Sequence, residues 1–325
     1  MNDMILRASG MAIEISGMEL VTRVDLEVGR GRRLGLVGET GSGKTLTCRA
    51  LVGTLSTIGG EIVRGQLELQ GRDLRALGDA GWRGLHGRVI GFVPQNSQSS
   101  LNPLMRVGTH VIEVLELLSG AEGRTARRRA VELLSRVGLP DPERVMRLYP
   151  HQLSGGMRQR VMIALAIAGN PALLVADEPT TALDVTVQQS ILKLLSELAR
   201  NQAMSIVLVS HDLAIVGAAT DDIAVMYGGC VIESGPTQQI LGKPLHPYTQ
   251  ALLAARPSLG STTRLAGIPG TPISPDRWPD GCRFAPRCRR ATNLCRAVFP
   301  ETTDNGRGGS VACHYWAETI EPDSS

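Results

Sequence analysis

Gly38-Glu-Thr-Gly-Ser-Gly-Lys44-Thr45 is the stretch of this 325-residue chain that decides its fold. It matches the pattern G-x-x-x-x-G-K-[ST], in which glycines let the backbone wrap closely around a phosphate chain. An apolar run at residues 34–37 precedes it and a helix-prone segment follows it, which is the strand–loop–helix context that the pattern requires. We therefore predict a nucleotide phosphate site, with Lys44 on the β- and γ-phosphates and Thr45 on Mg²⁺. The residues assigned to it are Gly38, Glu39, Thr40, Gly41, Ser42, Gly43, Lys44 and Thr45.

The regions on either side of this loop alternate between strand-like and helix-like patterns. Residues 1–35 alternate apolar and polar side chains, as edge β-structure does. Continuous apolar strands separated by helices indicate an α/β fold with a parallel core sheet. The expected strands are residues 89–93, 172–176, 205–209 and 223–227, and the expected helices are residues 107–118, 126–137, 157–168 and 248–255.

Composition excludes several classes of protein. The chain has 34 Lys and Arg against 31 Asp and Glu, a net charge of +3, which is too balanced for a nucleic-acid or polybasic membrane-binding surface. Apolar stretches fall short of the roughly 20 residues that span a bilayer, and the N-terminus lacks a signal-peptide pattern. We therefore expect a cytosolic chain. Four of the six cysteines lie between residues 282 and 313, and in a reducing compartment such a cluster indicates metal before disulfides.

A pair of carboxylates follows the expected strand at residues 172–176. Asp177 at the end of that strand is placed to hold Mg²⁺, directly or through water. Glu178 is then expected to face the γ-phosphate and polarise the attacking water. The alternative, a surface Asp-Glu pair that caps the next helix, loses weight beside an intact phosphate loop.

Leu153-Ser154-Gly155-Gly156 opens the expected helix at residues 157–168 and forms a second candidate anion site. Taken alone, it is equally well read as an ordinary N-capped helix. In order, however, the chain shows a phosphate loop, Gln95 after a strand, Leu-Ser-Gly-Gly, Asp177-Glu178, Ala182-Leu-Asp184 and His211. In this order residues 5–235 resemble the ATP-binding subunits of ABC transporters. The resemblance implies a P-loop NTPase (RecA-like) core with an N-terminal antiparallel β-subdomain and an inserted helical subdomain at about residues 97–165.

The resemblance also implies roles for individual residues. Gln95 would contact Mg²⁺ or the attacking water, and His211 would contact the γ-phosphate. Ser154, Gly155, Gly156 and Gln159 would form the signature that closes on ATP held by another subunit, and Asp184 would lie in the inter-subunit loop. The family stacks adenine on an aromatic side chain, but alignment by eye puts Ile15 at that position. Aliphatic packing there loses about 1 kcal/mol of stacking energy and predicts weaker base selectivity.

One copy of each motif makes half of a functional assembly. In the family arrangement two ATPase chains face head to tail, and each ATP lies between one phosphate loop and the opposite signature. We expect the second ATPase to be a related, non-identical chain, with an identical one as the alternative. The resemblance implies two transmembrane permease subunits, an extracytoplasmic substrate-binding protein and a peripheral position on the cytoplasmic face of the inner membrane. It implies no nucleic-acid partner.

Three further features are similar to those of oligopeptide and dipeptide importers. They are residues 94–103 after the Gln95 strand, residues 245–252, and the cysteine-bearing tail. They predict an ATPase domain at residues 1–235, a C-terminal extension at residues 236–325, and di- or oligopeptides as cargo. A nickel or other small-solute importer of the same subfamily is the alternative, and a soluble ABC ATPase outside transport is the less favoured one.

The tail cysteines carry a prediction of their own. Their spacing matches neither a zinc ribbon nor a ferredoxin run. Related proteins carry a [4Fe–4S] cluster here, so the resemblance implies that the four thiolates are its ligands, while Zn²⁺ and bare thiols stay open. These ligands are Cys282, Cys288, Cys295 and Cys313. Cys48 and Cys230 are expected to be small buried apolar residues.

Overall fold

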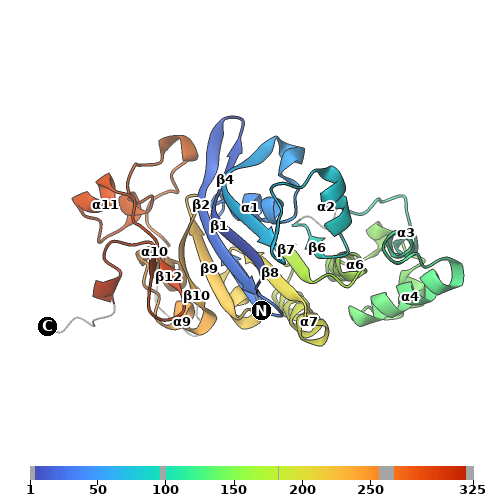
Figure 1. Ribbon diagram of the computed structural model, residues 1–325. Coiled ribbons are helices and arrows are strands. Elements are labelled where there is room, and N and C mark those ends of the chain that lie inside the picture. Colours follow the sequence, from blue (N-terminus) through green and yellow to red (C-terminus); the bar gives the residue numbers. More distant parts are fainter. Residues whose placement is uncertain (1–3, 96–99, 182, 256–266, 320–325) are drawn as a thin grey trace. The chain divides into compact units, whose positions relative to one another are not determined.

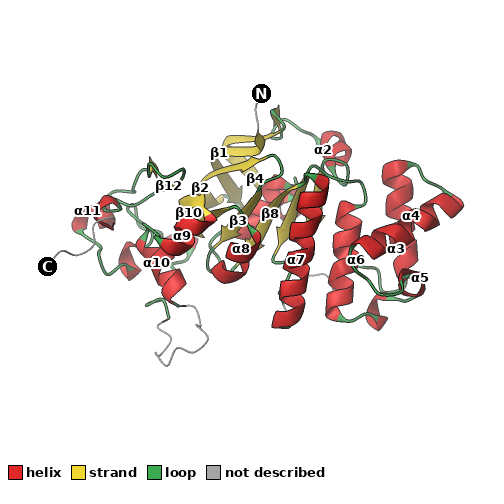
Figure 2. Cartoon of the chain, turned by 90° about the horizontal axis from the view of Figure 1, so that it is seen from below, coloured by secondary structure: helices red, strands yellow, loops and turns green. Residues whose placement is uncertain are grey.

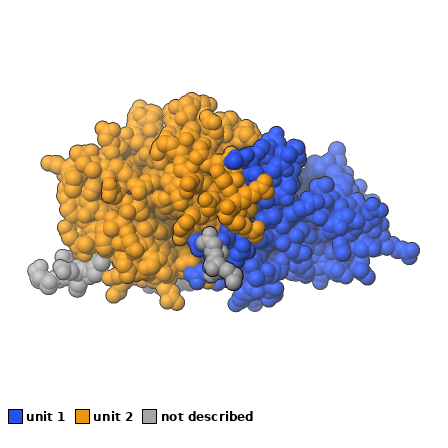
Figure 3. All heavy atoms as spheres, viewed as in Figure 1, with its two compact units in different colours: residues 1–5, 28–33, 76–208 blue, residues 6–27, 34–75, 209–325 orange. Residues whose placement is uncertain are grey.

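The computed structural model describes residues 4–95, 100–181, 183–255 and 267–319, so residues 96–99 and Ala182 of the quoted motifs lie outside the described residues. Its backbone contacts divide the chain into two compact units, coloured separately in Figure 3. The first unit comprises Met1–Ile5, Val28–Arg33 and Ala76–Leu208, and the second comprises Leu6–Glu27, Leu34–Arg75 and Val209–Ser325. The domain boundary at residue 235 stays a prediction.

The first unit combines buried parallel strands with a group of helices. Strand β6 (Ile90–Val93) pairs in parallel with β7 (Leu173–Asp177), and the neighbouring β8 begins in this unit (Ser205–Ser210). Every residue of β7 is buried, as expected for a strand covered on both faces. Helices α3, α4 and α6 pack on one another (Figure 2), and they confirm the helices expected there. The helices are α2 (Asp79–Leu85), α3 (Val107–Ser119), α4 (Gly123–Arg136), α5 (Pro142–Val145), α6 (Gly155–Ile167) and α7 (Val185–Gln202).

The second unit contains a mixed sheet with the strand order β5-β4-β1-β2-β10-β9-β3. The N-terminal strands confirm the expected antiparallel β-structure, since β1 runs antiparallel to β4, whereas β3 lies parallel to β9. The alternating pattern predicted no strand at β4 or β10. These strands are β1 (Met4–Ile15), β2 (Met18–Gly29), β3 (Arg33–Val37), β4 (Gly60–Leu69), β5 (Arg72–Asp73), β9 (Asp222–Tyr227) and β10 (Cys230–Pro236). The helices α1 (Lys44–Leu51) and α8 (Leu213–Ala219) belong to the same unit.

The C-terminal part of the second unit is attached to β10 at two places. Strand β12 (Ser310–Val311) pairs antiparallel with β10 and with β11 (Thr303–Asp304). The buried Glu233 carboxylate on β10 accepts the N–H groups of Leu245 at 2.7 Å and His246 at 3.0 Å. Figure 1 shows these segments in orange and red. The helices are α9 (Thr237–Gly242), α10 (Pro247–Ala254), which confirms the expected short helix, and α11 (Asn293–Ala297).

Among the described residues, none of the helices combines the length and the apolar character needed to cross a bilayer.

Candidate nucleotide-binding site

The phosphate loop joins β3 to α1, and two of its glycines are required by geometry. A Cβ at Gly38 would lie 2.2 Å from the Met226 carbonyl oxygen on β9, so no larger residue fits that close approach. Gly43 has φ +104°, a left-handed conformation that favours glycine, and it is the N-cap of α1. The loop is also tied to the β9–β10 turn, where the Gly229 N–H donates to the Ser42 carbonyl at 3.0 Å. The sequence pattern therefore builds the predicted loop.

The polar groups of this loop suit a phosphate chain. Lys44 is buried and its Nζ donates to the carbonyls of Gly38 at 2.8 Å and Glu39 at 3.0 Å, which holds the ammonium against the loop. The buried Ser42 Oγ has no hydrogen-bond partner within the described ranges, so it is available to a ligand. Thr45, at the first turn of α1, is exposed. A helix N-terminus with a lysine and hydroxyl groups is an anion site.

The predicted carboxylates end β7 in the first unit. Asp177 is buried at the carboxyl end of the strand. Glu178 follows with φ +46°, an uncommon conformation for a non-glycine residue that is often found at functional sites. Its Oε2 accepts Gln95 Nε2 at 3.1 Å and Thr181 Oγ1 at 2.9 Å. The structure thus brings Gln95 and Glu178 together and adds Thr181, which the sequence reasoning missed. Their catalytic roles stay predictions.

The signature residues form the start of α6. Ser154 is its N-cap, and its Oγ accepts the Met157 N–H at 3.2 Å. A Cβ at Gly156 would lie 2.8 Å from the Val187 side chain on α7, so glycine permits the close contact of the two helices. Asp184 in turn caps α7 by accepting the Val187 N–H at 2.9 Å. Gln159, on the first turns of α6, is buried.

The remaining predicted residues lie in the second unit. Ile15 ends β1 opposite Gly60 of β4 and is half-buried. His211 is exposed and directly follows β8. Sequence reasoning missed Arg287 and Tyr248, both of which bond to Glu39 of the phosphate loop. They are 248 and 209 residues from Glu39, and no local pattern signals a contact over such a distance.

The four tail cysteines line one pocket of the second unit, with a volume of about 380 Å³ including its solvent-open part. Burial raises the pKa of Cys282 to about 11 and also raises the pKa of Cys288 and Cys313. Backbone N–H groups of Phe284 and Ala285 bond to the Cys282 sulfur and lower its pKa in part. Within the described part of the chain, no group of three or more His, Cys, Asp or Glu side chains is arranged so that it could hold a metal ion. Cys48 and Cys230 are buried, as predicted.

Two family models match this chain in separate regions. The ABC transporter model matches residues 21–181, which include the phosphate loop, the signature and the carboxylates of β7. The model of the oligopeptide/dipeptide transporter C-terminal region matches residues 232–295, which include three of the four tail cysteines.

Curated relatives match over nearly the whole length. The oligopeptide transport ATP-binding protein AppD of Bacillus subtilis is 42% identical over 299 residues, which cover 92% of this chain and 91% of AppD. The dipeptide transport ATP-binding protein DppD of Escherichia coli is 44% identical over 304 residues, which cover 93% of this chain and 92% of DppD.

Solved structures agree on the fold. The ATP-binding cassette MJ0796, solved as a dimer in a post-hydrolysis state with ADP and Pi, has a TM-score of 0.63 and 27% identity, covering 71% of this chain and 98% of its own. The cbiO1 subunit of the Clostridium perfringens transporter complex cbiONQ has a TM-score of 0.65 and 26% identity, covering 75% of this chain and 93% of its own. The loop, the carboxylates and these matches define an ATP-hydrolysing P-loop protein of the ABC class. The chain belongs to the ATP-binding subunits of ABC transporters, in the group that carries the oligopeptide/dipeptide C-terminal region.

Proposed function

We propose that this chain is the ATP-hydrolysing, energy-coupling subunit of a membrane importer for di- and oligopeptides. The observation that carries the proposal is the phosphate loop of an ABC ATPase together with a C-terminal region of the oligopeptide/dipeptide type in one chain. AppD and DppD, which are similar over more than 90% of this chain, are named as oligopeptide and dipeptide transport proteins. Residues 1–235 serve as the ATPase domain and residues 236–325 as the extension.

The residues divide the chemistry of ATP hydrolysis among them. The amides of the loop, with Lys44, hold the β- and γ-phosphates and offset their charge. Thr45, Asp177 and Gln95 would hold Mg²⁺, which supplies charge neutralisation on the phosphate oxygens when bound. Glu178 accepts a proton from the attacking water, and Gln95 and Thr181 orient its carboxylate through the bonds described above. His211 contacts the γ-phosphate.

Hydrolysis requires a second ATPase. The signature of one chain, Ser154, Gly155, Gly156 and Gln159, closes on ATP held by the loop of its partner, and Asp184 lies at the same seam. Loss of the γ-phosphate removes contacts that only the closed pair makes, so the halves separate. The partner is a related, non-identical chain, and the pair moves two permease subunits at the cytoplasmic face of the inner membrane. An extracytoplasmic binding protein delivers the cargo.

The assignment of Glu178 is tested by Glu178→Gln. The amide keeps an oxygen that can accept from Gln95 and Thr181 but cannot accept a proton, so turnover should fall by about a thousandfold or more while an ATP-bound closed pair accumulates. Glu197→Gln on the exposed face of α7 is the matched control. Normal hydrolysis by Glu178→Gln would remove Glu178 from the role of base.

Uptake experiments test the cargo. Cells that lack this chain should regain uptake of a labelled dipeptide with the wild-type gene and with Lys193→Ala, an exposed lysine of α7, but not with Lys44→Ala. Uptake of ⁶³Ni²⁺ should be the same in all strains. Nickel uptake that depends on Lys44, with peptide uptake unaffected, would replace peptides by the small-solute alternative. If neither solute depends on Lys44, the transport assignment is wrong.

We propose, further, that Cys282, Cys288, Cys295 and Cys313 hold a [4Fe–4S] cluster. The donor set supports this, because four thiols from segments up to 31 residues apart line one pocket, and iron–sulfur clusters are bound by four cysteine thiolates. Among the described residues these thiols are not arranged around a common metal position, so their side chains would have to turn toward one centre to bind the cluster. Burial raises the pKa of Cys282, Cys288 and Cys313 and favours the protonated thiols, and the backbone N–H groups that bond to these sulfurs offset part of that effect. Such a cluster would supply iron, bound through sulfur, that can accept an electron. The four thiols would have to release their protons to bind it.

Anaerobic purification tests the metal. We expect about four iron and four sulfide ions per chain, with absorbance in the blue part of the visible spectrum. Cys288→Ala should lose the iron, the sulfide and the absorbance. Cys48→Ala, which removes a buried cysteine outside the pocket, should keep them. Stoichiometric zinc without iron would establish the zinc alternative. Neither metal after anaerobic purification would leave the four cysteines as bare thiols.

A further inference from the structure

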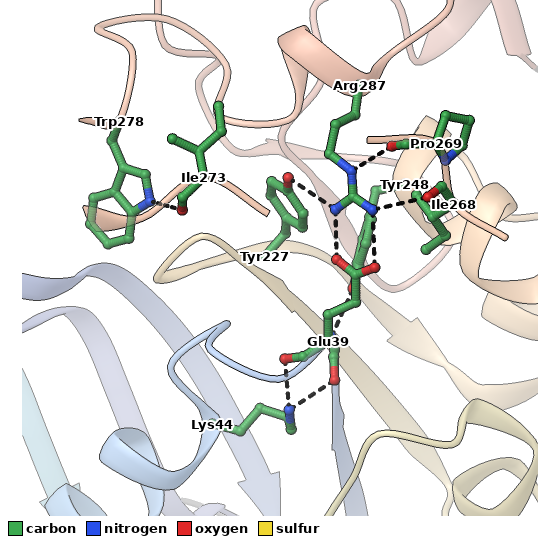
Figure 4. Close-up of polar contacts among 10 residues, drawn as sticks. Glu39, Lys44, Tyr227, Tyr248, Ile268, Pro269, Ile273, Trp278 and Arg287 are labelled. Carbon is green, nitrogen blue, oxygen red and sulfur yellow. Dashed lines mark hydrogen bonds and ion pairs between the residues drawn. The ribbon is translucent and has the colours of Figure 1, made fainter. Parts of the chain in front are cut away.

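The phosphate loop has an acidic residue whose partner comes from the C-terminal extension. The Glu39 carboxylate accepts both terminal nitrogens of Arg287, at 2.7 Å to Nη1 and 3.1 Å to Nη2 (Figure 4). The Arg287 side chain is 3% exposed and that of Glu39 is 24% exposed. A two-pronged arginine–carboxylate pair of this kind has a fixed geometry as well as a charge, so it sets the position of both residues.

The Arg287 side chain is also fixed by hydrogen bonds to residues outside the phosphate loop. Its Nε donates to the Pro269 carbonyl at 2.8 Å, Nη2 donates to the Ile268 carbonyl at 3.4 Å, and Nη1 lies 3.3 Å from the Tyr227 hydroxyl. Its backbone lies in the short 3-10 turn Ala285–Arg287. All three guanidinium nitrogens are therefore engaged, and the extension presents the cation at one place.

Glu39 is fixed at its backbone as well. Its N–H donates to the Tyr248 hydroxyl at 2.9 Å, and its carbonyl accepts Lys44 Nζ at 3.0 Å. The Tyr248 ring packs on Tyr227, with centroids 4.6 Å apart, and on Phe284, with centroids 5.4 Å apart. Figure 4 shows the resulting chain of contacts from Arg287 through Glu39 to the lysine of the loop. The extension thus touches the residue on which the phosphate-binding lysine rests.

The charge of Glu39 explains why this support matters. A carboxylate in a loop that binds polyphosphate repels the ligand, and more strongly where water is excluded. The Arg287 guanidinium offsets that charge and turns the carboxylate away from solvent and toward the extension. Resting on the proposed ATP-binding function, we propose that Arg287 is a positioning residue for the Glu39 carboxylate: it neutralises that charge and holds it away from the bound phosphates. In this way the C-terminal extension sets the ATP affinity of this chain.

Nucleotide affinity of the full chain tests this, with a fluorescent Mg²⁺–ATP analogue as the probe. Arg287→Gln should raise the dissociation constant by about tenfold or more, because it leaves Glu39 charged and unpaired beside the phosphates. Glu39→Gln should change it by less than about threefold. The double variant Arg287→Gln/Glu39→Gln should have a dissociation constant within about threefold of that of Glu39→Gln, since the repelling charge is gone. Such non-additive effects would show that the two residues act as a pair. Arg287→Lys keeps the charge but loses the two-pronged hydrogen bonding of the guanidinium, so its dissociation constant should lie between those of wild type and Arg287→Gln.

Controls separate this inference from the function on which it rests. Arg7→Gln breaks an exposed ion pair with Glu27 in the same unit and should bind ATP as the wild type does. Failure of both wild type and Arg7→Gln to bind the probe would overturn the ATP-binding function. Normal binding by wild type and by Arg287→Gln, or a double variant as weak as Arg287→Gln alone, would overturn the role of Arg287 in neutralising and positioning the Glu39 carboxylate. If Arg287→Gln is unfolded at the assay temperature, as thermal melting would show, Arg287→Lys decides by the same criterion.

Discussion

The phosphate loop and the extension that supports it are built in opposite ways. The loop at residues 38–45 takes its shape from consecutive residues, above all from glycines that permit a close approach to β9 and a left-handed turn into α1. Its support by Arg287 and Tyr248 joins residues more than 200 positions apart. The comparison teaches that the shape of the loop is local, whereas the position of its Glu39 carboxylate and the neutralisation of that charge come from the C-terminal extension.

The largest effect is expected where the local geometry is broken. In Gly38→Ala the new Cβ would lie 2.2 Å from the Met226 carbonyl oxygen and 2.7 Å from Ser42 Oγ, so the loop or β9 must move. Displacement of catalytic groups by about 1 Å costs about 100-fold, and we expect a loss of ATP affinity of that order. Titration with Mg²⁺–ATP measures it, with Gly78→Ala as the control, since nothing lies within 4 Å of a Cβ there. Wild-type affinity in Gly38→Ala would show that the loop is not locally determined.

A smaller effect is expected on the extension side, in the dependence of stability on pH. His246 is fully buried, which lowers its pKa from 6.5 to about 3. Between those pH values the unfolded chain binds a proton that the folded chain does not, so the free energy of unfolding falls by about 1.4 kcal/mol per unit as pH decreases. His246→Asn keeps an acceptor for the Tyr248 N–H that Nδ1 now receives at 3.0 Å. The substitution should therefore abolish about 2 to 3 kcal/mol of the decrease in the free energy of unfolding that the wild type shows between pH 7 and pH 4.5.

Urea unfolding at the two pH values measures this difference. Burial raises the pKa of Glu233, which acts in the opposite direction, but Glu233 is present in both proteins and cancels from the comparison. His151→Asn, at an exposed position, should leave the pH dependence as it is in the wild type. Equal pH dependence in wild type and His246→Asn would show that the extension does not hold a buried neutral histidine.

The smallest effect concerns the base of the nucleotide. Ile15 is the last residue of β1, and we predict that it occupies the position of the family's aromatic ring, where an aromatic contact adds about 1 kcal/mol. Ile15→Tyr should therefore raise the affinity for ATP relative to GTP by about fivefold, with Ile15→Leu as the volume-matched control. Equal ATP and GTP selectivity in Ile15→Tyr and wild type would place the adenine elsewhere.

The contrast between features set by consecutive residues and contacts between distant segments also explains what the sequence could predict. The loop, the strand that ends at Asp177 and the glycines of α6 follow from short contiguous patterns, and the structure contains each of them. Strands β4 and β10 escaped prediction because they are held by pairing with β1 and β9. The contact of Thr181 with Glu178 is local, three residues apart, but it depends on the positive φ of Glu178, which no residue pattern signals. The contacts of Arg287 and Tyr248 with Glu39 depend on tertiary placement that no pattern within one segment encodes.

The central claim is that the signature of one ATPase completes the ATP site of the other. Ser154→Asp tests it most directly, because aspartate keeps the N-cap of α6 but places a carboxylate where a γ-phosphate should lie, and Ser154→Asn keeps the cap without the charge. The measurement is steady-state ATP turnover by the assembled pair, with ATP binding to the isolated chain alongside. We predict unchanged binding in both variants and a turnover in Ser154→Asp about 100-fold below that of Ser154→Asn. Wild-type turnover by an unpaired chain that carries Ser154→Asp would contradict the account.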